Sequence, residues 1–403
     1  MTDISAAHEL SVALVGVGGF GATFIPALLA GGREHGFRFV GGVDPFAEKS
    51  KKLPELRAAN VPLYATMDEL YDRVTPDLVV LATPIPLHAR QTTLAVGRGS
   101  HVLCEKPIAA TPAEAQQMRA ARDAAKRHVA IGYQWSFSRA TQALKADALA
   151  GVFGKLKRMR TVVLWPRDEA YYARNDWAGA IKNRRGDWVL DSPVNNACAH
   201  HLHHMLYVAG DAVDRSATPT RMTAELYRAN PIQNFDTAAL RLELPEGVEA
   251  LFYVTHAGQK THHPIYTFEF EHATVEQKDE NDAHIVATFK DGTRRDYGTT
   301  ATDYRDGKLW ETIAAIREGR PTLCGIEAAT PHCQVVWACQ QLNDRIATFP
   351  ADRLENVGGD GHNFTTVPGM DDTLLDCWRR GVLPSEAGVK WATTPATVAV
   401  DPV

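Results

Sequence analysis

The sequence has no apolar run of 18 residues or more, and no basic segment precedes its first apolar stretch. A membrane-spanning helix needs about 20 consecutive apolar residues, and a secretory signal peptide begins with a positively charged region. Because the sequence shows neither feature, it predicts a cytoplasmic protein without a membrane partner.

The chain also has no run rich in lysine and arginine, and its net charge at pH 7 is -5. Nucleic-acid-binding domains usually carry a basic patch or stripe, so no nucleic-acid partner is expected. The six cysteines form no Cys-x-x-Cys pair. This scattered usage favours a reducing compartment, again the cytoplasm.

The composition that remains is ordinary for a globular protein, with 45% hydrophobic and 23% charged residues. A chain of 403 residues exceeds what one hydrophobic core usually holds. We therefore expect two domains, at residues 1–132 and 133–350, followed by a C-terminal extension at residues 351–403.

The first domain opens with a glycine-rich loop, because the apolar strand Leu10–Val15 runs directly into Gly-Val-Gly-Gly-Phe-Gly, with a helical pattern after it. In such a loop Gly16 permits a tight turn, Gly18 lets the backbone approach a pyrophosphate, and Gly21 lets helix and strand pack closely. The residues of this loop expected to bind a dinucleotide are Gly16, Gly18, Gly19, Phe20 and Gly21.

The next strand, Phe37–Val43, ends at Asp44. A carboxylate there would accept hydrogen bonds from the adenosine ribose hydroxyls and repel a 2′-phosphate, which favours NAD over NADP as the cofactor. A Gly-x-Gly-x-x-Gly sequence by itself can be purely structural. The strand, helix and acid that surround this one favour cofactor binding.

Further strands at 77–82 and 128–132 alternate with helices. The sequence Thr111-Pro112-Ala113-Glu114 is a capping box with proline at the first helical position, so a helix should begin there. This alternation predicts an α/β Rossmann domain with a doubly wound parallel sheet.

Residues 100–107 form a short apolar strand that ends in a carboxylate, an ammonium and a proline: Glu105, Lys106 and Pro107. In an open α/β sheet, ligands lie beyond the carboxyl ends of the strands. A lysine at that edge, beside a bound nicotinamide, could move a proton while the cofactor moves a hydride. An isolated Glu-Lys-Pro would more often be a surface ion pair followed by a turn, but the preceding glycine loop and acid favour the catalytic interpretation.

Beyond residue 133 the pattern changes to longer strands, hairpin turns and two late helices, which predicts an α+β domain. The strands are expected at 155–165, 221–228, 238–244, 248–255, 265–271 and 284–289, and the helices at 308–318 and 327–343. The extension is rich in Gly, Pro and Thr, with one short helix at 371–380. It could be an arm that wraps a neighbouring domain or subunit.

A loop rich in aromatic residues and arginine runs from Trp165 to Trp188. It could recognise a sugar, because aromatic rings pack on the C–H faces of sugars while arginine bonds their hydroxyls. It could equally be a packing loop between domains or subunits. Its candidate substrate-site residues are Trp165, Arg174 and Trp177.

Several motifs together resemble the signature of the Gfo/Idh/MocA family of glucose–fructose oxidoreductase, inositol dehydrogenase and rhizopine catabolism proteins. They are Thr83-Pro84-x-x-x-His88, His101-Val-Leu-Cys-Glu-Lys-Pro107, Gly132-Tyr133 and Asn196-Ala-Cys-Ala-His200-His-Leu-His203. The resemblance covers about residues 10–345 and is more specific in the first domain than in the second.

The resemblance implies a Rossmann domain followed by a domain with an open, mostly antiparallel sheet. That sheet is often the dimer surface, so a homodimer or homotetramer is expected through it. The resemblance also implies proton transfer by Lys106 and His200, a nicotinamide-ribose contact from Glu105, and a cis Lys106–Pro107 bond. It adds to the cofactor-site candidates Thr83, Pro84, His88, Glu105 and Lys106.

The sequence departs from the family pattern at Asn196, where an aspartate is common, and at His203, which replaces a second acid. An asparagine cannot act as a carboxylate base, but it can orient a hydroxyl with one donor and one acceptor. Asp191, in the preceding loop, is the candidate for the missing charge. The expected substrate-site residues are Asn196, Asp191, Tyr133, Trp165, Arg174 and Trp177.

The histidines at positions 200, 201, 203 and 204 also invite a metal site, because residues three and four apart share a helix face. No HExxH zinc motif occurs in the sequence, and the resemblance explains His200 without a metal. We expect no metal.

The sequence therefore predicts an NAD-dependent oxidoreductase that transfers a hydride between nicotinamide and a hydroxyl-bearing carbon of a sugar, cyclitol or related polyol. One alternative is a glycoside hydrolase or lyase that uses NAD transiently. Another is a catalytically silent NAD-binding sensor.

Overall fold

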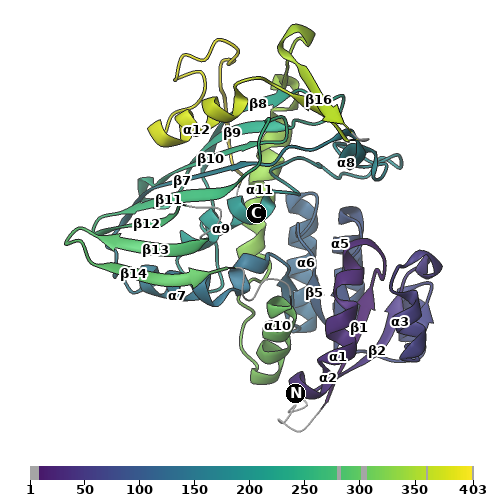
Figure 1. Cartoon of the computed structure of the whole chain (residues 1–403). Helices are drawn as coiled ribbons and strands as arrows, with labels where there is room; N and C mark the ends of the chain where they lie inside the picture. The colour runs from purple at the N-terminus through teal and green to yellow at the C-terminus, as the bar shows by residue number, and fades with distance from the viewer. Residues whose placement is uncertain (1–8, 279–282, 301–305, 360–361, 402–403) are drawn as a thin grey trace. The chain divides into compact units, whose positions relative to one another are not determined.

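The structure, a computed structural model, describes residues 9–278, 283–300, 306–359 and 362–401, with the side chain of Arg33 left out. The chain forms two compact units, both drawn in Figure 1. The first unit consists of residues 1–137 and 303–329, and the second of residues 138–302 and 330–403.

The described part of the first unit is built on a six-stranded parallel sheet with the order β3-β2-β1-β4-β5-β6. The strands are β1 (Leu10–Val15), β2 (Phe37–Val43), β3 (Leu63–Tyr64), β4 (Leu78–Leu81), β5 (His101–Cys104) and β6 (Val129–Ile131). Strands β4 and β5 are buried at every position, as a parallel sheet covered on both faces requires. The predicted doubly wound Rossmann sheet is confirmed.

The helices of this unit are η1 (Gly19–Thr23), α1 (Ile25–Ala30), α2 (Gly32–His35), α3 (Leu53–Ala58), α4 (Met67–Tyr71), α5 (His88–Gly97), α6 (Pro112–Ala125) and α10 (Gly307–Glu318). The capping box at the start of α6 is present. Thr111 Oγ1 accepts a hydrogen bond from Glu114 N at 3.3 Å, and Glu114 Oε2 accepts one from Thr111 N at 3.0 Å.

The division of the chain differs from the expected one in two ways. The first unit extends to residue 137 rather than 132, and it also includes the late segment 303–329. The reason is contact within the unit: the α10 residue Trp310 lies against Phe37 of β2, with ring centroids 5.8 Å apart. Local patterns along the sequence do not report such a return of the chain.

The second unit is built on a ten-stranded sheet with the order β14-β13-β12-β11-β7-β10-β9-β8-β15, with β18 paired to β8. The strands are β7 (Leu156–Leu164), β8 (Arg221–Arg228), β9 (Thr237–Glu243), β10 (Glu249–Thr255), β11 (His262–Phe270), β12 (Ala273–Gln277), β13 (His284–Phe289), β14 (Arg294–Thr299), β15 (Ala347–Thr348) and β18 (Ala396–Ala399). The pairs β7–β10 and β8–β15 are parallel and the other described pairs antiparallel, which confirms the predicted sheet class.

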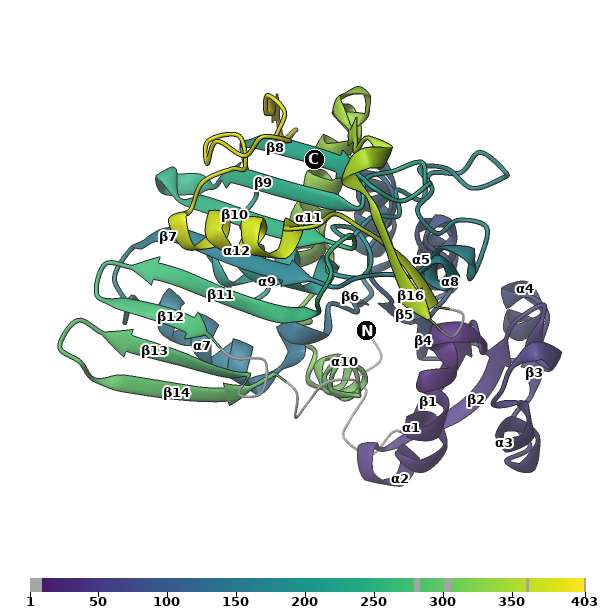
Figure 2. The same cartoon turned by 45° about the horizontal axis from the view of Figure 1, so that its top comes forward.

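The longer helices of this unit are α7 (Arg139–Leu149), α9 (Ala199–Val208), α11 (Ile326–Gln341, which begins in the first unit) and α12 (Met370–Arg380), and a short helix α8 spans Glu169–Ala173. Side chains alternate along β7, so Val162 and Leu164 face α12. The ring of His204 on α9 packs against Tyr266 and Phe268, which pair with the intervening β7 residues. Helices α9 and α12 therefore cover opposite faces of the sheet (Figures 1 and 2).

The C-terminal extension packs on one face of the sheet of its own unit, the face that α12 covers. Its apolar residues Met370, Leu374, Leu375, Cys377 and Leu383 join a buried cluster with Val162, Leu164, Leu251 and Tyr253. In this structure the extension lies on its own unit, and an arm that wraps a neighbouring domain or subunit stays a prediction.

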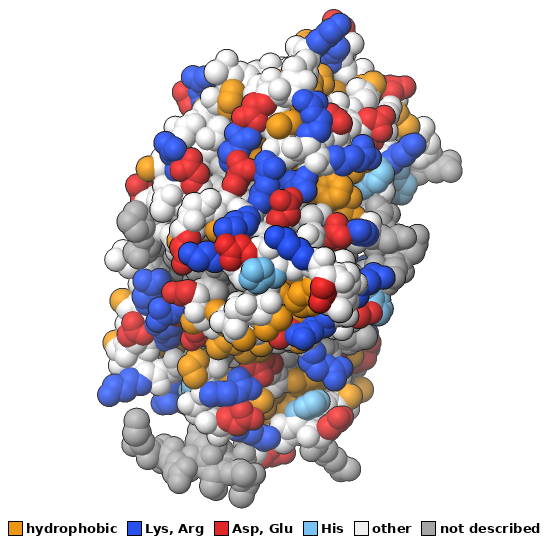
Figure 3. Space-filling view, turned by 90° about the vertical axis from the view of Figure 1, so that its left-hand side faces the viewer, with side chains coloured by type: hydrophobic (Ala, Val, Ile, Leu, Met, Phe, Trp, Pro, Cys, Tyr) orange, Lys and Arg blue, Asp and Glu red, His pale blue; other side chains and the backbone are white. Residues whose placement is uncertain are grey.

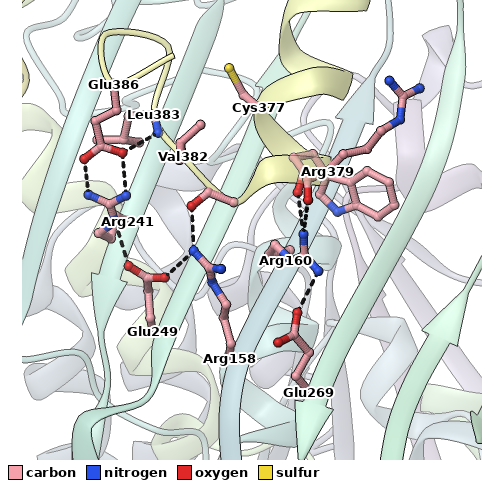
Figure 4. A network of polar contacts seen from close by, with 12 residues as sticks. Arg158, Arg160, Arg241, Glu249, Glu269, Cys377, Arg379, Val382, Leu383 and Glu386 are labelled. Carbon is pink, nitrogen blue, oxygen red and sulfur yellow. Dashed lines mark hydrogen bonds and ion pairs between the residues drawn. The ribbon is translucent and has the colours of Figure 1, made fainter.

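Arginines on the sheet hold the end of α12, as Figure 4 shows. Arg160 of β7 donates a hydrogen bond to the carbonyl oxygen of Trp378 at 2.9 Å, and Arg241 of β9 forms two bonds to Glu386, of 2.6 and 2.7 Å. Helix C-termini leave carbonyl groups unpaired and carry partial negative charge, so guanidinium groups stabilise them.

A hairpin of the extension contacts the aromatic loop of the same unit. It consists of β16 (Glu355–Gly359) and β17 (His362–Thr366). His362 Nδ1 lies 2.5 Å from Asp168 Oδ2, at the N-cap of α8, and Asp168 also forms a bridge with Phe364. The hairpin therefore fixes the start of the helix that carries Tyr171 and Tyr172.

Two surface observations bear on possible partners. On the face shown in Figure 3, basic and acidic side chains are interspersed and do not gather in one basic patch. Among the helices of the described residues, none has both the length and the apolar character that crossing a bilayer demands.

Candidate active site

The glycine loop after β1 is shaped by close backbone approaches. Gly16 has a φ of +88°, and a Cβ there would lie 2.5 Å from the carbonyl oxygen of Ala82. A Cβ on Gly21 would lie 1.8 Å from the carbonyl oxygen of Gly16, so only glycine fits at these two positions. A Cβ on Gly19 would meet nothing within 4 Å. The loop is therefore packed closely against backbone atoms at Gly16 and Gly21, while Gly19 has free space around it.

Asp44 follows β2 and lies beside this loop. Its Oδ2 accepts a hydrogen bond from Val17 N at 3.1 Å, and its Oδ1 accepts one from Phe46 N at 2.8 Å. A Cβ on Gly18 would lie 3.7 Å from Oδ2. Each carboxylate oxygen keeps a lone pair for a further donor. The geometry is compatible with the predicted contact to the adenosine ribose.

His88, the last residue of the Thr83-Pro84 motif, connects two loops at the edge of the sheet. Its Nδ1 lies 2.7 Å from the carbonyl oxygen of Pro107, and its Nε2 lies 2.8 Å from that of Thr83. The ring is 1% exposed, and burial lowers its pKa, which favours the neutral form. Backbone carbonyls therefore lie beside both ring nitrogens, and His88 connects the Pro107 and Thr83 loops, while its predicted contact with the cofactor stays a prediction.

Glu105 and Lys308 form a buried ion pair just after β5. Lys308 Nζ donates a hydrogen bond to Glu105 Oε1. The side chain of Lys308 is 1% exposed and that of Glu105 is 8% exposed. The other carboxylate oxygen lies 3.3 Å from the backbone N of Lys106. The Lys308 ammonium also lies 5.1 Å from the ring centroid of Phe20 and 5.0 Å from that of Phe24. One lysine therefore connects the Glu-Lys-Pro edge with the glycine loop.

Lys308 was not predicted from the sequence, although one signal was present. It stands in the first turn of α10, directly after Gly307, where the helix dipole disfavours a cation. A lysine at that position, in a helix with an apolar face, indicates a specific anionic partner. The partner, Glu105, is 203 residues away in the sequence, so only the folded structure identifies it.

Gly132 has a steric role at the same carboxylate. A Cβ on Gly132 would lie 3.0 Å from both carboxylate oxygens of Glu105, so the glycine of the Gly132-Tyr133 motif makes room for that side chain. Tyr133 is fully buried in the first unit. The Lys106–Pro107 bond is cis, which confirms what the resemblance implied.

In the second unit, four of the predicted substrate residues lie in one network. Asn196 Nδ2 donates to Asp191 Oδ1 at 2.8 Å, and Asp191 Oδ2 lies 3.7 Å from a guanidinium nitrogen of Arg174. The Arg174 guanidinium lies 5.2 Å from the ring centroid of Trp177. A carboxylate therefore lies beside Asn196, and the substrate-site role of Asp191 stays a prediction.

The remaining second-unit candidates lie around the start of α9. His200 is the second residue of that helix, and the ring of its neighbour His201 lies 5.3 Å from that of Trp165. Tyr133, also a substrate candidate, belongs to the first unit. His200 and Lys106 are likewise on different units, so their cooperation stays a prediction.

The other histidines of α9 are core residues. His203 stacks on Tyr207 with ring centroids 5.7 Å apart, and burial lowers the pKa of His204 to about 3. Across the described residues, no three His, Cys, Asp or Glu side chains gather in a metal-binding group.

A comparison with protein families supplies the identity of the first domain. The family described as "Oxidoreductase family, NAD-binding Rossmann fold", Gfo/Idh/MocA, matches residues 10–133. Residues 10–133 thus match the NAD-binding domain of the Gfo/Idh/MocA family, and curated relatives include an inositol 2-dehydrogenase and a rhizopine catabolism protein. The resemblance seen in the sequence motifs is thereby confirmed.

Curated relatives of the chain include dehydrogenases. It is 27% identical to inositol 2-dehydrogenase of Rhodococcus jostii over 157 residues, covering 38% of this chain and 41% of the relative. It is 34% identical to D-glucoside 3-dehydrogenase of Escherichia coli over 83 residues, covering 21% and 24%. The chain thus aligns with less than half the length of these relatives.

Solved structures share the fold over most of the chain. One is the WlbA dehydrogenase of Bordetella pertussis in complex with NADH and UDP-GlcNAcA, with a TM-score of 0.67 and 19% identity. The match covers 84% of this chain and 97% of the other. At this identity the likeness shows the fold of both domains.

The first unit fits the NAD that this family binds. Gly19 is sterically open where a pyrophosphate would lie, Asp44 beside the loop would hold the adenosine ribose, and Glu105 carries an anchored carboxylate at the edge of the sheet. When bound, NAD supplies the ring that exchanges a hydride with a substrate carbon.

Proposed function

We propose that this protein is an NAD-dependent dehydrogenase acting on a hydroxyl-bearing carbon of a sugar, cyclitol or related polyol. The observation that carries the proposal is the Glu105-Lys106-Pro107 edge, whose carboxylate is held by Lys308 and which is tied by His88 to the Thr83-Pro84 turn. An edge fixed by two independent contacts suits a site that positions reacting groups.

In the oxidation direction, Lys106 is the proposed proton acceptor for the substrate hydroxyl. His200 would hydrogen-bond the same oxygen or relay the proton, while Glu105 would hold the nicotinamide ribose. Asp44 would hold the adenosine ribose and select NAD over NADP.

The substrate would be bound by the network of the second unit, with Tyr133 from the first. An asparagine carries both a donor and an acceptor, and Asn196 donates to the buried Asp191, so the pair joins an amide and a carboxylate, groups that suit a substrate hydroxyl. Trp165 and Trp177 would offer ring faces to the C–H groups of the substrate.

We also propose that the protein forms a homodimer or homotetramer through the second-domain sheet. Only part of that sheet is free of the C-terminal extension and could contact a second copy. The extension covers the α12-bearing face of the sheet near β7 and β10. On β13, however, Val286 is partly exposed and Thr288 exposed. A second copy would therefore contact the β12–β14 end of the sheet.

The cytoplasm is the proposed location of the protein. The six cysteines are buried and unbridged, which supports a reducing compartment.

The experiment is to incubate the purified protein with NAD and a panel of polyols and glycosides, and to follow NADH by ultraviolet absorbance. Net NADH formation with a free polyol is expected. Cleavage of a glycoside without net NADH would instead indicate the transient-redox hydrolase or lyase. Tight NAD binding with neither outcome would indicate a sensor.

A further inference from the structure

A cationic cluster lies beside the proposed substrate network of the second unit. Two guanidinium groups approach the ring of Tyr171: that of Arg174 lies 3.6 Å from the ring centroid and that of Arg167 lies 4.9 Å from it. Arg167 also lies 5.7 Å from the ring of Trp165, and His256 lies 5.7 Å from Tyr171, ring to ring. We call these five residues the Arg167 cluster.

The carboxylates near this cluster are already engaged elsewhere. Asp191 faces Arg174 and accepts hydrogen bonds from Gly179 N at 2.6 Å and Asn196 Nδ2 at 2.8 Å. Asp168 accepts from Tyr171 N at 2.8 Å and pairs with His362. None of the described residues gives the Arg167 guanidinium a carboxylate or another hydrogen-bond acceptor. Arg167 is therefore the surplus positive charge of the cluster.

Three buried nitrogen atoms of the cluster have no hydrogen-bond partner among the described residues: Trp165 Nε1, Arg167 Nε and His256 Nε2. The first two carry N–H groups at all ordinary pH values. Burial and the two arginines lower the pKa of His256, so its ring is neutral, and Nε2 is an N–H donor when Nδ1 accepts from the Tyr172 hydroxyl. Buried donors are nearly always paired, so this concentration needs an explanation.

Tyr172 forms only a long hydrogen bond with His256. Its hydroxyl lies 3.4 Å from His256 Nδ1, at the outer limit of a hydrogen bond, and leaves Nε2 without a partner. The aromatic rings around Arg167 accept its charge only weakly, through their faces. Unused donors and an uncompensated guanidinium are the features of a site for a negatively charged oxygen group.

We propose that the Arg167 cluster binds an oxyanion group, a carboxylate or a phosphate, carried by the polyol substrate. The proposal rests on the proposed function, because it names the substrate class of that same site. The substrate would then be a sugar acid or sugar phosphate rather than a neutral sugar, with Arg167 as the residue that selects it. A planar guanidinium forms two parallel hydrogen bonds with either group.

The test uses the full chain and three simple probes: sodium acetate, sodium D-gluconate and inorganic phosphate, each compared with chloride at equal ionic strength. Thermal unfolding is followed with and without NAD. At concentrations well above the dissociation constant, at least one probe should raise the unfolding midpoint by about 2–4 °C. A response to acetate or gluconate identifies a carboxylate site, and a response to phosphate alone identifies a phosphate site.

Arg167→Gln should abolish the response, and Arg167→Lys should keep only part of it, since lysine retains the charge but loses the planar fork. Arg353→Gln is the matched control, because Arg353 is exposed and its side chain has no hydrogen bond or ion pair with the described residues. Calorimetry should show at least about a tenfold weaker affinity of Arg167→Gln for the responding probe.

The proposal is overturned if no probe stabilises the wild type, or if Arg167→Gln and Arg167→Lys both respond like the wild type. A folded Arg167→Gln variant is recognised by an unchanged unfolding midpoint in chloride, and Arg167→Lys decides the matter if Arg167→Gln does not fold. Failure of the proposed function is seen separately, as an absence of NAD binding or turnover by the wild type. A wild type that oxidises neutral polyols with NAD but ignores the three probes keeps the function and loses the oxyanion site.

Discussion

Lys308 and Glu105 depend on each other because both charges are buried. The desolvation of a buried charge is offset only by its partner, so removing one partner costs more than removing both. Lys308→Met should lower the free energy of unfolding by about 3 kcal/mol, while the double variant Lys308→Met/Glu105→Gln should recover part of that loss. Chemical denaturation measures both quantities.

The control for this comparison is Lys155→Met, since Lys155 is exposed in the second unit and its replacement should change stability by less than about 0.5 kcal/mol. Lys308→Met should also weaken NAD binding, because the freed Glu105 carboxylate is no longer fixed at the edge of the sheet. If the single and double variants lose the same stability, the two charges are not coupled and this account of the ion pair is wrong.

His101 provides a second prediction, on pH dependence. Its Nδ1 accepts a hydrogen bond from His128 N at 2.9 Å, which requires an unprotonated nitrogen, and burial lowers its pKa to about 3. Between pH 6.5 and 3 the unfolded chain therefore binds a proton that the folded chain does not. The stability that this group contributes is complete above pH 6.5 and is lost as the pH falls toward 3.

Replacing His101 by Asn keeps an acceptor near the Nδ1 position and removes the titration. Between pH 6.5 and pH 5 the wild type should lose about 2 kcal/mol more than His101→Asn in its free energy of unfolding. Denaturant unfolding at the two pH values measures this difference. Equal losses in the two proteins would show that His101 does not control this part of the acid response.

At the scale of elements, α12 shows how the extension is held. Leu374 is fully buried in the cluster that joins this helix to the sheet. Leu374→Ala should cost about 2–4 kcal/mol, because it removes buried methyl groups and leaves a cavity. Arg379→Ala, an exposed position on the same helix, should cost less than about 0.5 kcal/mol.

Thermal and denaturant unfolding of these two variants test the packing of α12. A small cost for Leu374→Ala, similar to that of Arg379→Ala, would mean that α12 is not packed on the sheet in solution. The hairpin β16–β17 would then lose its support as well.

Elements with strong local signals were predictable from the sequence. The buried strands β1, β4 and β5 are mostly apolar, and the capping box predicts the start of α6. The helix expected after the glycine loop differs, since a 3-10 helix at Gly19–Thr23 precedes α1. Strands β16 and β17 were missed because they are polar and mostly exposed, so they lack an apolar pattern.

At the scale of the whole molecule, the sequence motifs predicted one half of the site better than the other. The cofactor half is built from contiguous loops, so Asp44, Glu105 and Lys106 could be proposed from their order along the chain. Contacts that join distant segments, such as Lys308 with Glu105 and Arg174 with Asp191, depend on how α10 and the aromatic loop fold back. The sequence carries no local record of those contacts.

The central claim is that Lys106 transfers the proton while NAD exchanges the hydride. The most direct measurement compares steady-state NADH formation and NAD affinity for the wild type, Lys106→Met and the control Lys155→Met, with the polyol that gives turnover. Lys106→Met should bind NAD within about a factor of a few of the wild type but lose at least about 100-fold in turnover, while Lys155→Met should behave as the wild type. A Lys106→Met protein that turns over at nearly the wild-type rate would show that Lys106 does not transfer the proton.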